Sequence, residues 1–275
     1  GGSHKLGAQG PAGITDRGKE TCTQCAHRVR RLVATRSPDV HRTAHLGAAA
    51  AVRIICTRRS RVNVLRGSRQ SMRASALLIM AAMDISSTTA LRCVIVPGNG
   101  CTGRVADANW YGWLERELRR DSPFREVVVP ETMPDPVGAK ESVWVPFMRD
   151  TLKVGADTVV VGHSSGAVAA MRLAEETPVA ALVLVSACHT DLGDPGERAA
   201  GYYARPWRWD AIRANAGRIV QFHSDNDPFI PDTEARHVAE NLQSEYSELP
   251  GRSHFFTPPF AECLEVCREI AASTT

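Results

Sequence analysis

Residues 158–166 read Thr-Val-Val-Val-Gly-His-Ser-Ser-Gly, a run of strand-forming residues followed by a turn rich in glycine and serine. The run predicts a buried β-strand, and the alanine-rich residues after it predict a helix. A strand, a Gly-x-Ser-x-Gly turn and a helix in this order are typical of a nucleophile elbow, which lifts a serine hydroxyl above the sheet. Gly162 and Gly166 flank Ser164 because larger side chains there would collide with the neighbouring strand and helix. We therefore expect Ser164 to be a nucleophile.

Strands and helices alternate on both sides of this turn. From residue 91 onward, short runs rich in β-branched residues alternate with stretches of helical periodicity. Such strands, apolar on both faces, predict a mostly parallel, doubly wound sheet covered on both sides, a three-layer α/β/α sandwich. Pro146 must lie early in its helix or kink it. The expected strands are residues 93–96, 127–129, 158–161, 181–185, 218–222 and 245–249, and the expected helices are residues 110–120, 141–152, 165–176, 233–242 and 259–272.

A serine nucleophile on this fold needs an acid and then a histidine, in that order along the chain. Asp225 and Asp227 both follow the fifth expected strand. Asp227 is the better candidate, because Pro228 stiffens the loop and fixes the direction of the carboxylate. His254 follows the last expected strand and satisfies the order. We expect Ser164 to attack an acyl carbon, His254 to take its proton, and Asp227 to hold the imidazole in the right tautomer.

The oxyanion formed in such an attack needs two N–H donors. One is expected to be the backbone N–H of Ser165, which opens the helix after the nucleophile. The other should come from the loop after the first strand, Pro97-Gly98-Asn99-Gly100, where glycine lets the backbone come close. Asn99 and Gly100 are the two candidates, and the sequence does not choose between them.

Further motifs run collinearly along residues 91–270, among them Val-Ile-Val-Pro-Gly-Asn-Gly at 94–100, Trp-Tyr-Gly-Trp at 110–113 and Arg-Pro-Trp at 205–207. With these motifs the chain resembles the small serine hydrolases of the retinoblastoma-binding protein 9 type, a branch of the α/β-hydrolases. The resemblance implies that fold and a triad of Ser164, Asp227 and His254. The remaining motifs that carry it are residues 133–136, 141–148, 162–166, 191–194, 227–229 and 254–255.

The resemblance does not extend to the pocket-protein partner of that family. Its L-x-C-x-E peptide is missing, since residues 152–156 read Leu-Lys-Val-Gly-Ala. The nearest approach, residues 264–269, is one residue too long. We expect a small ester or amide to be the partner, cleaved through an acyl-enzyme intermediate. The alternative is a non-catalytic α/β-hydrolase scaffold that acts as a protein-binding module.

Aromatic side chains near the site suggest what it accepts. Residues 188–210, between the fourth and fifth strands, form an insertion of the kind that often covers an active site. Trp110, Tyr203 and Trp207 are candidates for lining an apolar substrate pocket. In the alternative interpretation these aromatics are core anchors between helix and sheet.

Charge divides the chain into two regions. Residues 1–90 contain 15 Lys and Arg against 4 Asp and Glu, whereas residues 91–275 contain 18 against 26. An acidic body is a poor nucleic-acid binder, because phosphate contacts need clustered Lys and Arg. No apolar run reaches the roughly 18 residues of a spanning helix. No dinucleotide or phosphate-loop motif is evident, so we expect neither cofactor nor metal, and neither nucleic acid nor membrane as partner.

Residues 1–90 are expected to be a disordered basic extension, and residues 91–275 the hydrolase domain, because no aromatic residue precedes Trp110. The extension could lie outside the native protein, with a natural start near Met80. It could instead be a transit peptide, or hold a secretory signal from Met72. Cys22, Cys25, His41 and His45 have zinc-ligand spacing but lack the apolar core of a finger, so chance is the better explanation. We expect a cytoplasmic protein, or an organellar one if the extension is a transit peptide.

Overall fold

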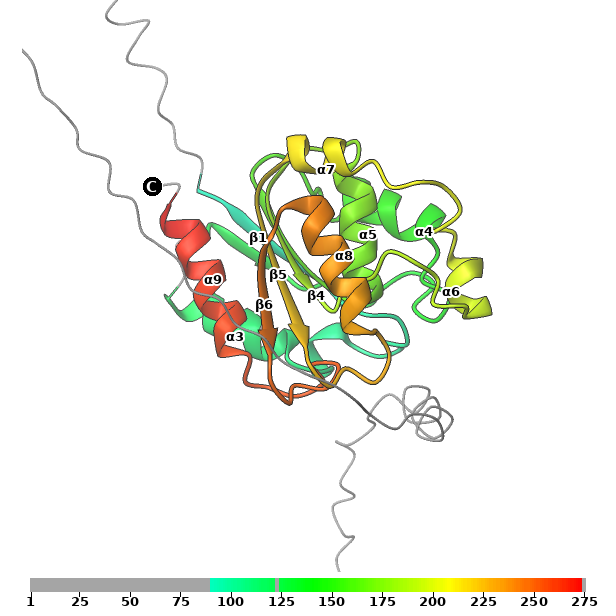
Figure 1. Cartoon of the computed structure of the whole chain (residues 1–275). Helices are drawn as coiled ribbons and strands as arrows, with labels where there is room; N and C mark the ends of the chain where they lie inside the picture. The colour runs from blue at the N-terminus through cyan, green and yellow to red at the C-terminus, as the bar shows by residue number, and fades with distance from the viewer. Residues whose placement is uncertain (1–89, 122–123, 274–275) are drawn as a thin grey trace, which may run out of the picture. The chain divides into compact units, whose positions relative to one another are not determined.

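The computed structural model describes residues 90–121 and 124–273, and its centre is a six-stranded parallel sheet (Figure 1). The strand order is β2-β1-β3-β4-β5-β6, and every neighbouring pair is parallel. The expected parallel, doubly wound sheet is therefore confirmed. The strands are β1 (Arg92–Val96), β2 (Glu126–Val128), β3 (Thr158–His163), β4 (Val179–Val185), β5 (Ala216–Ser224) and β6 (Glu245–Leu249).

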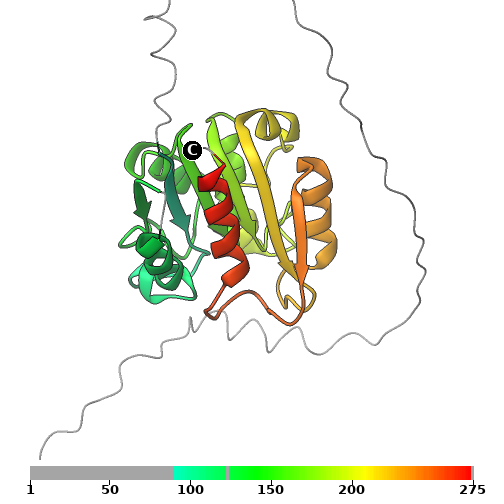
Figure 2. The ribbon, with the colours of Figure 1, turned by 90° about the vertical axis from the view of Figure 1, so that its left-hand side faces the viewer.

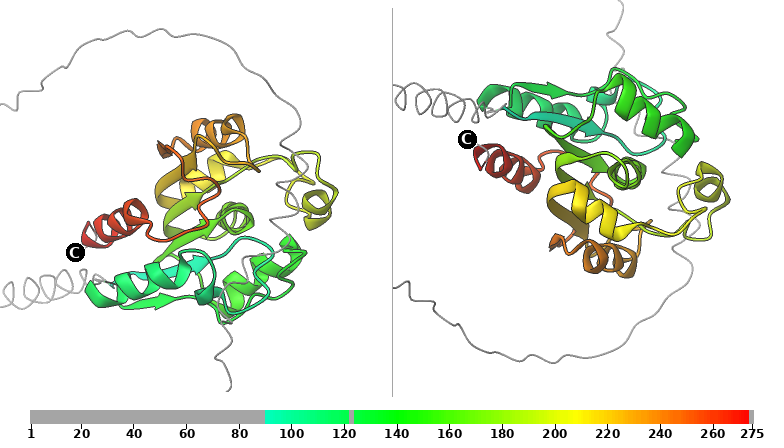
Figure 3. Two further views of the ribbon diagram at one scale, coloured as in Figure 1. Left: turned by 90° about the horizontal axis from the view of Figure 1, so that it is seen from below. Right: turned by 90° about the horizontal axis from the view of Figure 1, so that it is seen from above.

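Helices cover both faces of the sheet. α3 and α9 lie on one face and α4, α5, α7 and α8 on the other, as Figures 2 and 3 show. Burial explains the pattern, because every residue of β1 and β3 is buried and the strands need cover on both sides. The helices are α3 (Tyr111–Asp121), α4 (Glu141–Pro146), α5 (Ser165–Ala174), α6 (Pro195–Ala200), α7 (Trp209–Asn215), α8 (Asp232–Leu242) and α9 (Ala261–Ala272).

The helix expected over residues 141–152 is present, but it changes its type after Pro146, where the sequence predicted a kink. The α-helical part ends at Pro146, and a π-helical turn, η2 (Phe147–Thr151), follows it. Proline has no N–H to donate to the carbonyl four residues earlier, so the α-helical ladder is interrupted at this position. A wider turn is one way in which a helix continues past such a break.

The 188–210 insertion contains a helix that the sequence analysis did not place. α6 begins after Asp194, whose carboxylate accepts hydrogen bonds from the N–H groups of Gly196 at 2.8 Å and Glu197 at 3.0 Å. Pro195 occupies the first helical position, and Gly201 ends the helix at φ 92°. An aspartate cap, a proline after it and a closing glycine are recognised helix signals, so this helix could have been predicted.

The predictions for residues 1–89 lie outside the described residues. They include the disordered extension, the targeting segments and the cysteine and histidine set at positions 22, 25, 41 and 45. Within residues 90–121 and 124–273, no helix has the length and apolar character needed to cross a membrane.

Candidate active site

Ser164 stands on a strained turn between β3 and α5. Its backbone has φ 54° and ψ −122°, a conformation that non-glycine residues rarely adopt. The N–H of Ser164 donates to the Val185 carbonyl at 2.8 Å, which ties the turn to the end of β4. A Cβ atom on Gly166 would lie 2.4 Å from the Pro97 carbonyl oxygen, and one on Gly162 would lie 2.6 Å from the Gly166 carbonyl oxygen. Both positions therefore require glycine, as the sequence analysis expected.

The loop after β1 passes directly against this turn. A Cβ atom on Gly98 would lie 3.2 Å from the Cβ atom of Ser164. The N–H of Gly100 donates to the Pro136 carbonyl at 2.7 Å, so that group is already bonded. Among the described residues, none accepts a hydrogen bond from the N–H of Asn99, while its side-chain amide donates to Glu197 at 3.2 Å. Within the part of the chain that the structure describes, the two candidates that the sequence left open therefore differ in that only the N–H of Gly100 has an acceptor.

Asp227 and His254 meet beside the carboxyl ends of β5 and β6. Nδ1 of His254 lies 2.8 Å from Oδ2 of Asp227, and the Ser186 hydroxyl donates to the same oxygen at 2.9 Å. The N–H groups of Phe229 and Ile230 donate to Oδ1 of Asp227 at 2.9 Å and 3.1 Å. Burial acts to raise the pKa of Asp227, but these hydrogen bonds and the His254 charge outweigh it and lower that pKa below its usual value. Asp227 is thus built to stay ionised.

The two residues before Asp227 have a different task. Asp225 is exposed, and its carboxylate accepts the N–H of Gly251 at 2.8 Å. Asn226 accepts the N–H of Ser253 at 2.8 Å. Both side chains therefore tie the loop after β5 to the loop that carries His254. The structure brings Asp227, and not Asp225, to the histidine.

Three residues near His254 were missed by sequence reasoning. Phe229 and Phe256 are half-buried, with ring centroids 5.0 Å and 5.4 Å from the His254 ring. Each phenylalanine lies two residues after Asp227 or His254 in the sequence, and this position could have identified it as a neighbour of the site. Ser186 had a similar signal, as it directly follows β4. Together the two phenylalanines give the imidazole an aromatic border.

Of the three aromatic residues expected to line a substrate pocket, the structure contradicts the prediction for Trp110. Trp110 is fully buried and packs edge-on against Tyr111 and Phe260, so it belongs to the core and lines no surface. The Tyr203 hydroxyl lies 3.1 Å from the Cys188 sulfur, and the Trp207 Nε1–H donates to the His189 carbonyl at 2.9 Å. These polar tips bond within the 188–210 segment. The alternative interpretation, core anchors, describes Trp110 well.

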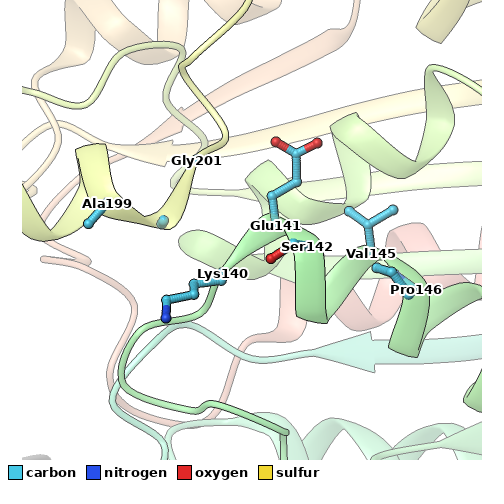
Figure 4. Close-up of a pocket in the computed structure, with 8 residues that line it drawn as sticks. Lys140, Glu141, Ser142, Val145, Pro146, Ala199 and Gly201 are labelled. Carbon is cyan, nitrogen blue, oxygen red and sulfur yellow. The ribbon is translucent and has the colours of Figure 1, made fainter.

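A cavity of about 370 Å³ lies between α4 and α6 (Figure 4). Its lining contains none of the candidate catalytic residues. Figure 4 draws Lys140, Glu141 and Ser142 on one side and the end of α6 on the other. The lining residues are Lys140, Glu141, Ser142, Val145, Pro146, Ala199, Ala200 and Gly201.

Comparisons with known proteins show the family of this chain. Residues 93–258 match the family model described as serine hydrolase. The rat protein named serine hydrolase RBBP9 (Rattus norvegicus) is 46% identical over 179 residues, which cover 65% of this chain and 95% of that protein. The resemblance noted from the sequence is thereby confirmed.

Solved structures share the fold. The ydeN gene product of B. subtilis is 19% identical with a TM-score of 0.55, over 67% of this chain and 98% of that one. Est1E from Butyrivibrio proteoclasticus, with ferulic acid bound, is 14% identical with a TM-score of 0.52, over 70% of this chain and 92% of that one. At these identities the likeness concerns the fold alone.

Proposed function

The chain belongs to the serine hydrolase family, and on that premise we propose that Ser164, His254 and Asp227 form a catalytic triad that cleaves small esters or amides. The observation that carries the proposal is the bonded pair of His254 and Asp227 beside the strained Ser164 turn. An ionised, fully bonded carboxylate on Nδ1 leaves Nε2 of His254 as the proton acceptor.

The proposed reaction has two stages. In the first, Ser164 Oγ forms a bond to the acyl carbon while its proton passes to His254 Nε2, and that proton then leaves with the alcohol or amine. In the second, water attacks the acyl-enzyme, gives its proton to the same nitrogen, and Ser164 is released with its proton restored. Within the described residues, Ser164 makes no hydrogen bond to His254. Such bonds are often long without substrate and tighten when it binds.

For the oxyanion, we propose the backbone N–H groups of Ser165 and Asn99. Ser165 is the first residue of α5, where helical N–H groups lack partners within the helix. Asn99 is preferred over Gly100 because the N–H of Gly100 is bonded to Pro136. Loss of one such donor typically costs about 10²–10³ in rate.

The aromatic border of His254 supports a substrate with an apolar group. Phe229 and Phe256 present half-buried rings beside the proposed base. Apolar surface with few polar groups is the usual character of a small-molecule site. We therefore propose esters or amides with a short apolar or aromatic group.

The test is labelling with a fluorophosphonate probe, which reacts with an activated serine. Wild type should be labelled, Ser164→Ala should not, and Ser142→Ala, which removes an exposed serine on α4, should label like wild type. In a second arm, aryl esters should be hydrolysed faster than matched polar esters. A folded wild type that resists labelling would point instead to a protein-binding scaffold, and a flat ester profile would contradict the apolar preference.

A further inference from the structure

His163, the residue before the proposed nucleophile, is buried beneath the site and bonded through both ring nitrogens. It is 1% exposed. Its Nδ1 lies 2.6 Å from the Tyr111 hydroxyl, and its Nε2 lies 2.9 Å from the His254 carbonyl oxygen. The His163 and His254 rings lie 4.9 Å apart, centroid to centroid. One imidazole therefore links α3, the end of β3 and the loop that carries the proposed base.

The chemistry of the partners fixes where the protons lie. A carbonyl oxygen only accepts, so Nε2 of His163 carries the hydrogen and Nδ1 accepts from the Tyr111 hydroxyl. That hydroxyl accepts in turn from the N–H of Gly98 at 3.0 Å and from the Asn109 amide at 3.0 Å. Each donor in the chain thus faces an acceptor. We call these four residues, Gly98, Asn109, Tyr111 and His163, the buried network.

The network holds no charge in ordinary solution. Burial and, to a smaller extent, the nearby His254 lower the pKa of His163 from its usual 6.5 to about 3. Tyr111 is also 1% exposed. Neutral groups with every proton placed form a rigid connection at little cost in desolvation.

Resting on the proposed function, we propose that Tyr111 and His163 are positioning residues that hold the nucleophile, the oxyanion donor and the base in mutual register. The buried network is linked directly to the nucleophile, the oxyanion donor and the base. His163 is bonded covalently to Ser164, and Gly98 is bonded covalently to Asn99. The third link is the hydrogen bond from His163 to the backbone of His254 itself.

Removing the Tyr111 hydroxyl should therefore disturb geometry more than binding. It would leave the buried Gly98 N–H, the buried Nδ1 of His163 and the half-buried Asn109 amide without this partner. Buried polar groups that lose a partner move or are desolvated at a cost. A shift of about 1 Å among reacting groups can cost about 100-fold in rate. Substrate affinity depends on other surfaces and should change little.

The experiment compares two matched variants, Tyr111→Phe and Tyr202→Phe. Tyr202 is also 1% exposed, but within the described residues its hydroxyl has no hydrogen-bond partner, so its loss removes nothing bonded. With a small aryl ester, Tyr111→Phe should lower kcat by roughly 10- to 100-fold with KM changed less than about threefold. Tyr202→Phe should keep kcat within about twofold of wild type, since hydroxyls without partners contribute little.

A second pair of variants, at His163, distinguishes a loss of positioning from a loss of folding. His163→Gln keeps one donor and one acceptor on a side chain of similar reach, whereas His163→Leu keeps neither. If the role is positioning, His163→Gln should recover at least part of the kcat that His163→Leu loses, at a temperature where circular dichroism shows both folded. Equal kcat in wild type and folded Tyr111→Phe, or a loss confined to KM, would overturn the proposal. Failure of the proposed function is separate, because then Ser164→Ala would retain the wild-type activity.

Discussion

The buried network and the 188–210 segment are held in place by different kinds of interaction. The network lies at the ends of β1 and β3 and consists of neutral groups. The 188–210 segment is fastened by a buried charge, the guanidinium of Arg172 on α5, which donates to the carbonyls of Tyr202, Arg205 and Pro206. Its counter-ion is Glu175, the C-cap residue directly after α5, and both side chains are almost fully buried. The difference teaches that one domain can hold one region through neutral hydrogen bonds and another through a buried pair of opposite charges.

This fastening also changes how the 188–210 segment is understood. The sequence suggested a lid. The guanidinium of Arg172 lies 3.6 Å over the Trp207 ring and bonds three backbone carbonyls around it. Because α5 also follows Ser164, the segment is attached to the helix of the proposed nucleophile. Earlier in the segment, the Glu197 carboxylate accepts a hydrogen bond from the side-chain amide of Asn99, in the loop after β1.

The largest loss of stability is expected when the buried Arg172 guanidinium loses its counter-ion, Glu175. Glu175→Ala would leave Arg172 buried without its counter-ion, and breaking such a pair typically costs about 3–5 kcal/mol of folding free energy. Glu248→Ala removes an ion pair with the exposed Arg236 and should cost less than about 1 kcal/mol. Urea denaturation of both variants measures the difference. Equal losses in the two variants would show that the Arg172 pair is not the fastening described above.

The free energy of unfolding should fall in acid, because the fold keeps His163 of the buried network neutral. The unfolded chain protonates His163 near its usual pKa of 6.5, but the folded chain resists protonation until about 3. The unfolded state then binds more protons, so stability falls as pH drops below 6.5, by up to about 1.4 kcal/mol per pH unit. The lowered pKa of Asp227 adds a loss only below its usual 3.8.

Denaturation between pH 7 and about pH 5.5 therefore reports mainly on the histidines, because Glu245 and Glu248, whose pKa values are lowered by their arginine partners, add to the slope nearer their usual 4.5. His189 and His223 also have lowered pKa values because of burial, so they contribute to the same slope. His163→Gln should reduce the slope while leaving part of it. An unchanged slope in that variant would mean that His163 is not held neutral by the fold.

The structural features described above differ in how well they can be predicted from the sequence. Strand runs and the Gly-x-Ser-x-Gly turn are local patterns, so the parallel sheet and the Ser164 turn were predicted correctly. Asp227 and His254 followed from chain order, and the structure brings them together, although their roles stay a prediction.

What the sequence could not supply are partners distant along the chain. Nothing near His163 indicates that its ring meets Tyr111, 52 positions earlier, or the backbone of His254, 91 positions later. The proposal of Asn99 over Gly100 depends in the same way on a distant partner, the Pro136 carbonyl. Trp110 was misplaced because a helical periodicity marks its face as apolar without saying whether that face meets the core or a substrate.

The smallest loss of stability is expected for a variant of Trp207, a residue that was predicted to line the substrate pocket. Trp207→Phe would remove the hydrogen bond to the His189 carbonyl and weaken the contact with the Arg172 guanidinium. One neutral hydrogen bond and one cation–π contact together account for about 1–2 kcal/mol. Because the Trp207 ring is engaged with Arg172, this loss should appear in the free energy of unfolding, with the KM for aryl esters unchanged. A raised KM with unchanged stability would instead return Trp207 to the substrate site, and would make the 188–210 segment part of the binding surface.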